Sequence, residues 1–312
     1  MQNLSQRVAY GETLVKFGAE NEKVVALEAD LGKSTMSIMF QEKYPERYFE
    51  MGIAEANMIS VAAGLSLTGK IPFASTFAVF ASGRPYDQIR TSVCIPKLNV
   101  KICGSSAGLS DFGDGSTHQS IDDIAIMRVL PNMTVFSPVD AVETVQCMRA
   151  MLEIDGPCYI RVNRNDLPIL TEENRAFEVG RVYPIKTDGD ITVFATGVMV
   201  SIALEAAKVL AAEGINLKVY NVPTIKPLNT DDLLAALEGS KAFVTAEEHN
   251  VMGGMGGAIL EALAGKCTLP STLVGVKDSF GTSAYNYNDL LNRYELDAPA
   301  LADAVRKLVK EV

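Results

Sequence analysis

The chain has no tryptophan, only two histidines and five cysteines, and none of the cysteines forms a CxxC pair. Side chains of the types that bind zinc are therefore too few and too scattered to form a cluster. An odd, unpatterned set of cysteines is typical of a reducing compartment, where the thiols serve as small core hydrophobes. The cytoplasm is the location that this pattern favours.

Long apolar runs are also missing. Residues 1–18 lack the continuous apolar stretch of a secretory signal, and the most apolar region, 59–82, is interrupted by Lys70, Pro72 and several glycines. We expect no membrane association. Lys and Arg total 28 against 38 Asp and Glu, for a net charge of −10. This balance argues against a nucleic-acid partner, although a few local cations can still hold a small anion.

The length of 312 residues suggests about two domains. Short β-branched runs alternate with Ala- and Leu-rich stretches, which predicts an α/β fold with two parallel or mostly parallel sheets and helices on both faces. A polar, proline-containing segment without helical period follows the first such unit. We therefore expect a first domain over 1–168, a linker over 169–189 and a second domain over 190–312.

The expected strands are short and apolar. They cover residues 23–30, 71–77, 99–105 and 158–162 in the first domain, and 191–197, 217–222, 241–248 and 272–278 in the second. The main expected helices cover 54–68, 140–153, 201–214, 230–239, 256–265 and 300–312. Asp140 is the expected N-cap of its helix.

The segment 49–58, FEMGIAEANM, places Glu55 in the first turn of an apolar helix, just after a strand and a glycine turn. A carboxylate there could simply complement the helix dipole. However, most of its neighbours in sequence are apolar or small. Glu55 could therefore be buried, in which case it needs a partner.

Two further segments allow both a structural and a functional interpretation. Phe77 and Phe80 lie three residues apart, so they could be core residues or an aromatic wall for a flat heterocycle. The segment 104–119 is rich in small and polar residues, which predicts a loop. It carries His118, near Asp114, and the glycines around it allow a ligand to approach the backbone closely.

The other motifs give weaker signals. Arg161 and Arg164 follow a strand, where a guanidinium could bind phosphate, but a surface position is the better interpretation for Arg161. The glycine-rich turn at 253–259 lacks the context of a nucleotide-binding loop, and we assign no chemistry to the preceding segment 247–249.

Taken together, these segments resemble the C-terminal half of transketolase. The order of motifs is that of the family's pyrimidine-binding domain and its smaller C-terminal domain, and the similarity extends over nearly the whole chain. The matching motifs are GIAEANM (52–58), STFAVF (75–80), GDGSTHQ (113–119), NRNDLP (163–168), YNVPTIKPL (220–228) and VTAEEH (244–249).

The resemblance implies a thiamine diphosphate site. Glu55 matches the catalytic glutamate, which binds a ring nitrogen of the aminopyrimidine and favours its imino tautomer. Phe77 and Phe80 match the aromatic residues that stack on this ring, with Tyr86 as a candidate third. Asp30 and Leu31 fall at a cofactor-contacting Asp-Leu pair.

The resemblance also implies a sugar-phosphate site. Asp114 and His118 match residues that contact the sugar hydroxyls and the developing oxyanion, which gives His118 a catalytic role. Arg164 matches a phosphate-binding arginine, and Arg7 and Ser34 match two further phosphate contacts. Ser106 stands where transketolases usually carry another phosphate-binding histidine, so the resemblance leaves the sugar specificity open.

A GDG element with an asparagine about one helix later marks the diphosphate and magnesium site of thiamine enzymes. Here the only asparagine that follows soon after GDG at 113–115 is Asn132, which is too early. The resemblance therefore implies the C-terminal subunit of a split, two-chain transketolase. An N-terminal subunit would supply the diphosphate and magnesium ligands, and this chain would dimerise within a four-chain complex.

The implied activity transfers a two-carbon ketol unit from a ketose phosphate to an aldose phosphate. Four alternatives remain open at this stage: half of a deoxyxylulose-phosphate synthase, the beta subunit of a 2-oxo-acid dehydrogenase, a non-catalytic regulatory subunit, or a nucleotide-binding module. The joint presence of Glu55, both phenylalanines, Asp114 and His118 argues against a decayed, non-catalytic site.

Overall fold

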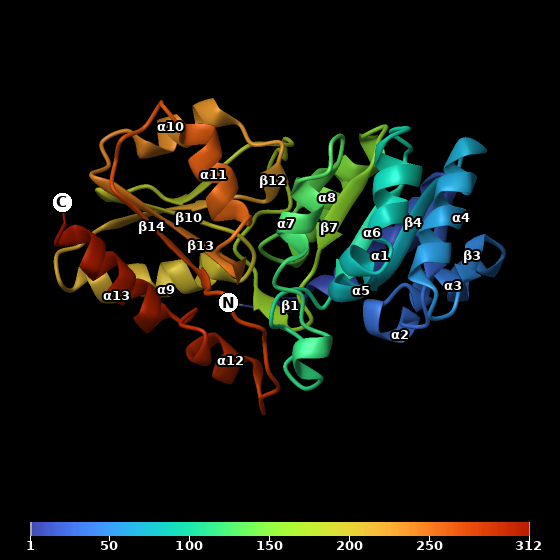
Figure 1. The fold of residues 1–312 in the computed structure, drawn as a ribbon, viewed down its shortest axis with the longest axis horizontal. Helices are drawn as coiled ribbons and strands as arrows, with labels where there is room; N and C mark the ends of the chain where they lie inside the picture. The colour runs from blue at the N-terminus through green and yellow to red at the C-terminus, as the bar shows by residue number, and fades with distance from the viewer. Residues whose placement is uncertain (1, 312) are drawn as a thin grey trace.

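The computed structural model describes residues 2–311 and contains two α/β units that lie side by side (Figure 1). The first unit, blue to green, is built on a seven-stranded sheet, and the second, yellow to red, on a five-stranded sheet. The N-terminus lies close to the junction between them. The predicted fold class is confirmed.

The seven-stranded sheet is parallel except at one edge, where β12 runs antiparallel to β6. In spatial order its strands are β12 (Thr224–Lys226), β6 (Thr134–Phe136), β7 (Cys158–Arg161), β5 (Lys101–Ser105), β4 (Ile71–Phe77), β2 (Val24–Glu28) and β3 (Tyr48–Glu50). A separate antiparallel pair joins β1 (Asn3–Ser5) to β8 (Asp166–Pro168).

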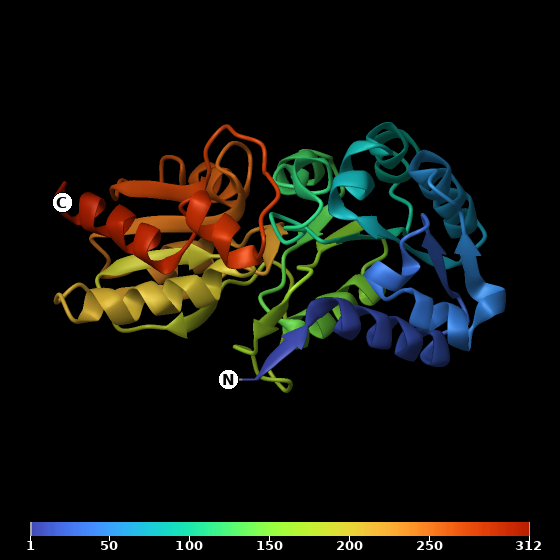
Figure 2. The same cartoon turned by 90° about the horizontal axis from the view of Figure 1, so that it is seen from below.

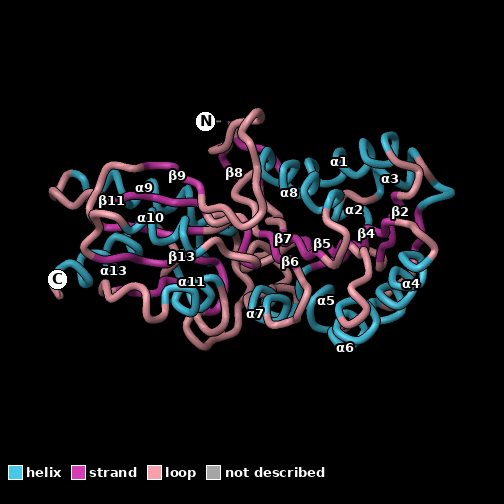
Figure 3. The backbone as a smooth tube through the Cα atoms, turned by 90° about the horizontal axis from the view of Figure 1, so that it is seen from above, coloured by secondary structure: helices cyan, strands magenta, loops and turns pink. Residues whose placement is uncertain are grey.

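Helices cover both faces of this sheet (Figure 3). One face carries α1 (Gln6–Glu20), α3 (Ile38–Lys43) and α8 (Ala141–Glu153). The other carries α4 (Glu55–Leu67), α5 (Ala78–Gly83), α6 (Tyr86–Gln88), the π-helical η2 (Ile89–Cys94) and α7 (Asp123–Arg128). Short turns of helix complete the unit: α2 (Gly32–Thr35), η1 (Pro45–Arg47) and η3 (Gly115–Thr117).

Local sequence signals place the helix that matters most for the site. Gly52 adopts a φ of +67°, which turns the chain after β3, and α4 begins at Glu55. The helix ends at Leu67, and Gly69 (φ +82°) redirects the chain into β4. Asp140 caps α8 as predicted, since its carboxylate accepts the N–H of Glu143 at 2.8 Å.

The five-stranded sheet is parallel except for its edge strand β9. In spatial order its strands are β14 (Ser271–Val276), β13 (Ala242–Asn250), β10 (Ile191–Ala195), β11 (Leu217–Asn221) and β9 (Tyr183–Lys186). One face carries α9 (Met199–Ala211), α12 (Tyr287–Arg293) and α13 (Ala298–Val309); Figure 2 shows α9 and α13 side by side. The other carries α10 (Thr230–Leu237) and α11 (Met255–Leu263).

The segment expected as a linker, 169–189, contains an element that the sequence did not reveal. Its residues 183–186 form β9 and belong to the second sheet. Conversely, β12 comes from the second half of the chain but pairs with β6 of the first sheet, as its position in Figure 1 shows. One apolar core also includes residues from both units, among them Met58 and Phe194.

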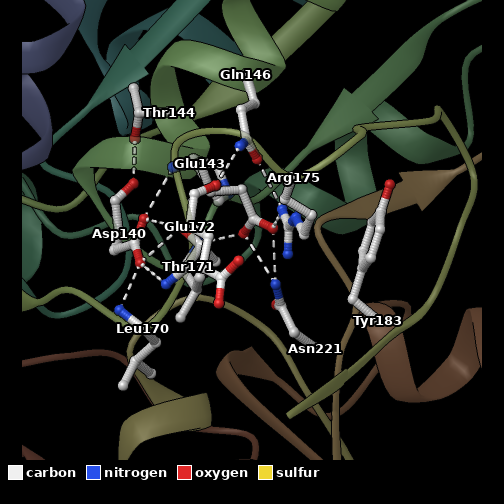
Figure 4. Close-up of polar contacts among 12 residues, drawn as sticks. Asp140, Glu143, Thr144, Gln146, Leu170, Thr171, Glu172, Arg175, Tyr183 and Asn221 are labelled. Carbon is white, nitrogen blue, oxygen red and sulfur yellow. Dashed lines mark hydrogen bonds and ion pairs between the residues drawn. The ribbon is translucent and has the colours of Figure 1, made fainter.

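A buried polar network holds the start of this segment (Figure 4). The Asp140 carboxylate accepts the backbone N–H groups of Leu170 and Thr171 at 2.7 and 2.8 Å. The neighbouring Glu143 carboxylate accepts from Arg175 at 2.6 Å and from Asn221 of β11 at 2.8 Å. Hydrogen bonds therefore hold the connection to both units. They also satisfy the two buried carboxylates, which would be costly to bury without partners.

Candidate active site

The candidate site lies at the carboxyl ends of the parallel strands of the first sheet, where α/β folds generally bind ligands. Glu55, at the start of α4, is buried with 4% of its surface exposed. Its Oε1 atom lies 2.6 Å from Nη1 of Arg84, a half-exposed residue that follows α5. Arg84 is therefore the partner that burial of this carboxylate requires.

The two predicted aromatic residues form a stacked pair. Phe77 ends β4 and Phe80 lies in α5, with ring centroids 6.1 Å apart and planes inclined by 14°. The guanidinium of Arg84 lies over the Phe80 ring, 4.0 Å from its centroid. Glu55, Arg84 and the two rings thus form one continuous row, with Phe80 only partly buried.

His118 lies at the other end of this row. Its ring meets both phenylalanines edge-on, with centroids 6.2 Å from Phe77 and 5.3 Å from Phe80. Thr117 Oγ1 lies within hydrogen-bonding distance of its Nδ1 atom, at 2.9 Å. Asp114 is exposed on the same loop, and no hydrogen bond joins it to His118 within residues 2–311.

The structure brings Arg7, Ser34 and Arg164 together beside the aromatic pair. Arg7 donates to the carbonyl oxygens of Ser34 at 2.8 Å and of Arg164 at 3.1 Å. Arg164 lies 6.0 Å from the Phe77 ring centroid and forms a 2.7 Å ion pair with Asp111. Burial, followed by the nearby charge of Arg164, lowers the pKa of Arg7. The two guanidinium groups can donate charge-assisted hydrogen bonds to a phosphate, which would then compete with the nearby carboxylates of Asp111 and Asp166.

Asp30 and Leu31 follow β2 in the loop next to the Glu55 turn. Asp30 adopts a φ of +60°, and its N–H donates to Glu50 Oε1 at 2.8 Å. The same oxygen accepts the N–H of Gly52 at 2.9 Å. Glu50 therefore ties the loop that carries Asp30 to the turn that leads into Glu55.

Three buried hydroxyl groups at the ends of β4 and β5 have no hydrogen-bond partner within residues 2–311: those of Thr76, Ser105 and Ser106. Ser106 also has a φ of +54°, which is uncommon for a residue other than glycine. Buried polar groups are nearly always paired, so three unpaired hydroxyl groups close together are an unusual feature of these strand ends. They adjoin Phe77 in the sheet, because Phe77 and Ser105 are register partners.

Tyr86 is the one predicted aromatic residue that the structure places apart. It lies in α6 and packs against the apolar core beneath α4. Within the described residues its ring contacts neither Phe77 nor Phe80. The sequence pattern shifts in spacing near Gly83, and α6 turns the Tyr86 side chain towards the core.

Sequence reasoning overlooked several residues of this region. Arg84 and Asp111 are the ion-pair partners of predicted residues. Glu28 is buried at the end of β2 and accepts from Thr35 Oγ1 at 2.7 Å and Ser37 Oγ at 2.5 Å. Its burial raises its pKa to about 7. The sequence feature that could have identified Glu28 is its position as the one acid at the end of the otherwise apolar strand VVALE.

The prediction of a surface position for Arg161 is wrong. Its side chain is 6% exposed and forms a 3.0 Å ion pair with the fully buried Asp123. Burial of the end of β7 under the second unit is the reason, because Arg161 also donates to the carbonyl of Glu248 at 3.3 Å.

Neither metal-binding nor membrane-spanning features emerge from the geometry of residues 2–311. No cluster of three or more His, Cys, Asp or Glu side chains there could hold a metal ion. No helix in this range is long and apolar enough to cross a membrane.

Comparison with known proteins decides the family. The model of the transketolase pyrimidine-binding domain matches residues 2–169, which is more than half of the chain. The chain belongs to the transketolase family. The model of the transketolase C-terminal domain matches residues 180–301, so both structural units of this transketolase chain have a counterpart.

Individual relatives agree with this assignment. A protein of Clostridium sp. named 6-deoxy-6-sulfo-D-fructose transketolase subunit SqwH is 42% identical over 88% of this chain and 85% of its own length. Human transketolase is 35% identical over 98% of this chain, which spans only 49% of the human protein. A solved structure described as a split gene transketolase, inactive beta4 tetramer, is 47% identical, with a TM-score of 0.90 and 99% coverage of both chains.

Proposed function

We propose that this chain is one subunit of a thiamine diphosphate-dependent, cytoplasmic transketolase that moves a two-carbon ketol unit from a ketose phosphate to an aldose phosphate. The observation that carries the proposal is the continuous row of Glu55, Arg84, Phe80, Phe77 and His118, with an arginine pair at its side. It combines an acid, a flat apolar surface, a proton-transfer group and an anion site.

The residues present fit one half of the cofactor. The stacked phenylalanines would hold the aminopyrimidine ring, and the buried carboxyl group of Glu55 would bind a ring nitrogen. Asp30 and Leu31 lie on the neighbouring loop. When bound, the cofactor supplies the reactive carbon and accommodates the charge that carbon–carbon bond cleavage releases.

The remaining groups suit the sugar substrate. His118 would hold or transfer a proton at a substrate oxygen, and Asp114 would contact the hydroxyl groups. Ser106 takes the position of a phosphate-binding histidine of the family and is fully buried. Arg7, Ser34 and Arg164 would bind the phosphate end. The arginine pair thus orients the substrate so that its carbonyl end faces the aromatic pair.

A partner chain completes the proposal. The chain spans about half the length of human transketolase, and the similar solved structure is described as a split-gene enzyme. We therefore expect an N-terminal subunit to hold the diphosphate and magnesium, and this chain to dimerise within the complex. Because Arg7 and Arg164 are assigned to the phosphate of the sugar, we expect the cations that neutralise the diphosphate of the cofactor to come from the partner.

The reaction can be tested by reconstituting this chain with such a subunit and assaying several donors. We expect ketol transfer from xylulose 5-phosphate to an aldose phosphate and no decarboxylation of pyruvate. Turnover of pyruvate instead would favour a synthase or dehydrogenase component. A 6-deoxy-6-sulfo ketose belongs in the assay, because an arginine pair can bind a sulfonate as well as a phosphate.

Arg164→Ala should raise KM for phosphorylated sugars by about 10- to 100-fold, because charge-assisted hydrogen bonds contribute about 1.5–3 kcal/mol. Steady-state kinetics with a phosphorylated and an unphosphorylated ketose would measure the effect. The matched control is Arg149→Ala, which removes an arginine paired with Glu20 at the surface. Equal losses with both ketoses would contradict a role in phosphate binding.

A further inference from the structure

The loop over residues 108–121 carries Asp114 and His118, but it contains little regular secondary structure. It is closed at its base by the paired backbone hydrogen bonds of Gly108 and Ser120, at 2.8 and 3.0 Å. Between them lies only the single helical turn η3. A polar, glycine-rich loop of this length needs outside contacts to hold a catalytic side chain in place.

Glu248 of the second unit contacts the start of this loop through a hydrogen bond and close packing. It lies in β13 with 6% of its surface exposed, and its Oε1 atom accepts the N–H of Leu109 at 2.7 Å. Gly108 packs so closely that an added Cβ would lie 2.4 Å from the carboxyl carbon of Glu248. A glycine is thus required here both for space and for its φ of +67°.

Other contacts from the second unit hold the middle and the end of the loop. The N–H of Ala284 donates to the carbonyl of Phe112 at 2.8 Å, and that of Asn250 to the carbonyl of Ile121 at 2.7 Å. The side chain of Gln119 donates to the carbonyl of Thr282 at 2.9 Å.

Apolar packing follows the same pattern. Leu109 is fully buried and Ile121 nearly so, and both belong to the core formed by the second unit rather than to that of the first sheet. Phe112 packs against the same core. The two ends of the loop are therefore anchored in the second unit, although the loop belongs in sequence to the first.

We propose that the second unit acts as a clamp on loop 108–121, and that Glu248 is the positioning residue of this clamp. The clamp consists of Glu248, Asn250, Thr282 and Ala284. Its contribution to catalysis rests on the function proposed above, because it acts by holding His118 against the aromatic pair. Its mechanical contribution does not depend on that function.

Amide hydrogen exchange on the isolated chain tests the clamp without partner or substrate. Glu248→Ala should speed exchange across residues 109–119 by about tenfold or more, since the loop then opens more often. Glu248→Gln keeps an acceptor oxygen and should restore the protection. If Glu248→Ala does not fold, Gln119→Leu loosens the same clamp from the loop side.

Glu247→Ala is the matched control. Glu247 is also buried in β13, but its carboxylate accepts from the N–H groups of Met255 and Gly256 at 2.6 and 2.8 Å, at the start of α11. Its removal should speed exchange around α11 and leave loop 108–121 protected. Equal loosening of the loop by both variants, or unchanged protection in Glu248→Ala, would overturn the proposal.

Kinetics of the reconstituted complex then separate positioning from general destabilisation. Glu248→Ala should lower kcat/KM for the sugar about tenfold or more while leaving half-saturation by thiamine diphosphate unchanged, because the cofactor contacts come from other elements. A parallel loss of cofactor affinity would count against the clamp. If loop exchange responds as expected but the wild-type complex transfers no ketol unit, the clamp stands and the proposed function fails.

Discussion

Replacing Glu55 with glutamine is expected to lower turnover of the reconstituted complex by about a thousandfold while leaving the chain folded. General acid–base groups typically contribute 10²–10⁴-fold, and an amide cannot share a proton with a ring nitrogen as a carboxyl group does. The fold should survive because glutamine has the same shape and the released partner, Arg84, is already 48% exposed. Initial-rate assays together with thermal unfolding measure both effects.

Asp87→Asn is a suitable control for this experiment. Asp87 is also an acid in the first turn of a helix, but it is exposed at the surface of α6. We expect the variant to retain nearly full activity. Turnover in Glu55→Gln above a tenth of the wild-type value would rule out the catalytic role assigned to Glu55.

The isolated chain is expected to bind thiamine diphosphate at least about 100-fold more weakly than the complex with an N-terminal subunit, and to show no ketol transfer. The geometry offers a stacking surface and a buried acid for one end of the cofactor, whereas we expect the cations that a diphosphate requires to come from the N-terminal subunit. Calorimetric titration in the presence of magnesium, with and without the partner, measures the difference.

Thiamine without the diphosphate is the control ligand for this titration. It presents the same ring to Phe77 and Phe80, so its affinity should change far less when the partner is added. Tight, magnesium-dependent binding of thiamine diphosphate by this chain alone would disprove the division of the site between two chains.

The sequence was sufficient to predict features that depend on neighbours along the chain. The turn at Gly52, the position of Glu55 in the first turn of α4 and the capping role of Asp140 each follow from local rules, and all are present. The aromatic pair and the loop histidine were also identified. The three-residue spacing of the phenylalanines and the polar, glycine-rich composition of the loop made them recognisable. The fold then brings them together near the ends of neighbouring parallel strands.

Features that depend on distant neighbours could not be predicted in the same way. Arg84 and Glu55 are 29 residues apart, and Glu248 and Leu109 are 139 residues apart, so no periodic pattern connects them. The strands β9 and β12 contain only four and three residues, too few for a recognisable alternation. Their pairing is set by tertiary packing, which overrides weak local preferences.

The position of β12 affects the stability of the first unit. It lies beyond residue 190 in sequence, yet it covers the rim of the first sheet by pairing with β6. Release of the second half would leave the backbone N–H and C=O groups at the outer edge of β6 unpaired, and such edge strands can pair with other chains and aggregate. Because β12 and the shared apolar core join the two halves, we expect loss of the second half to lower the stability of the first.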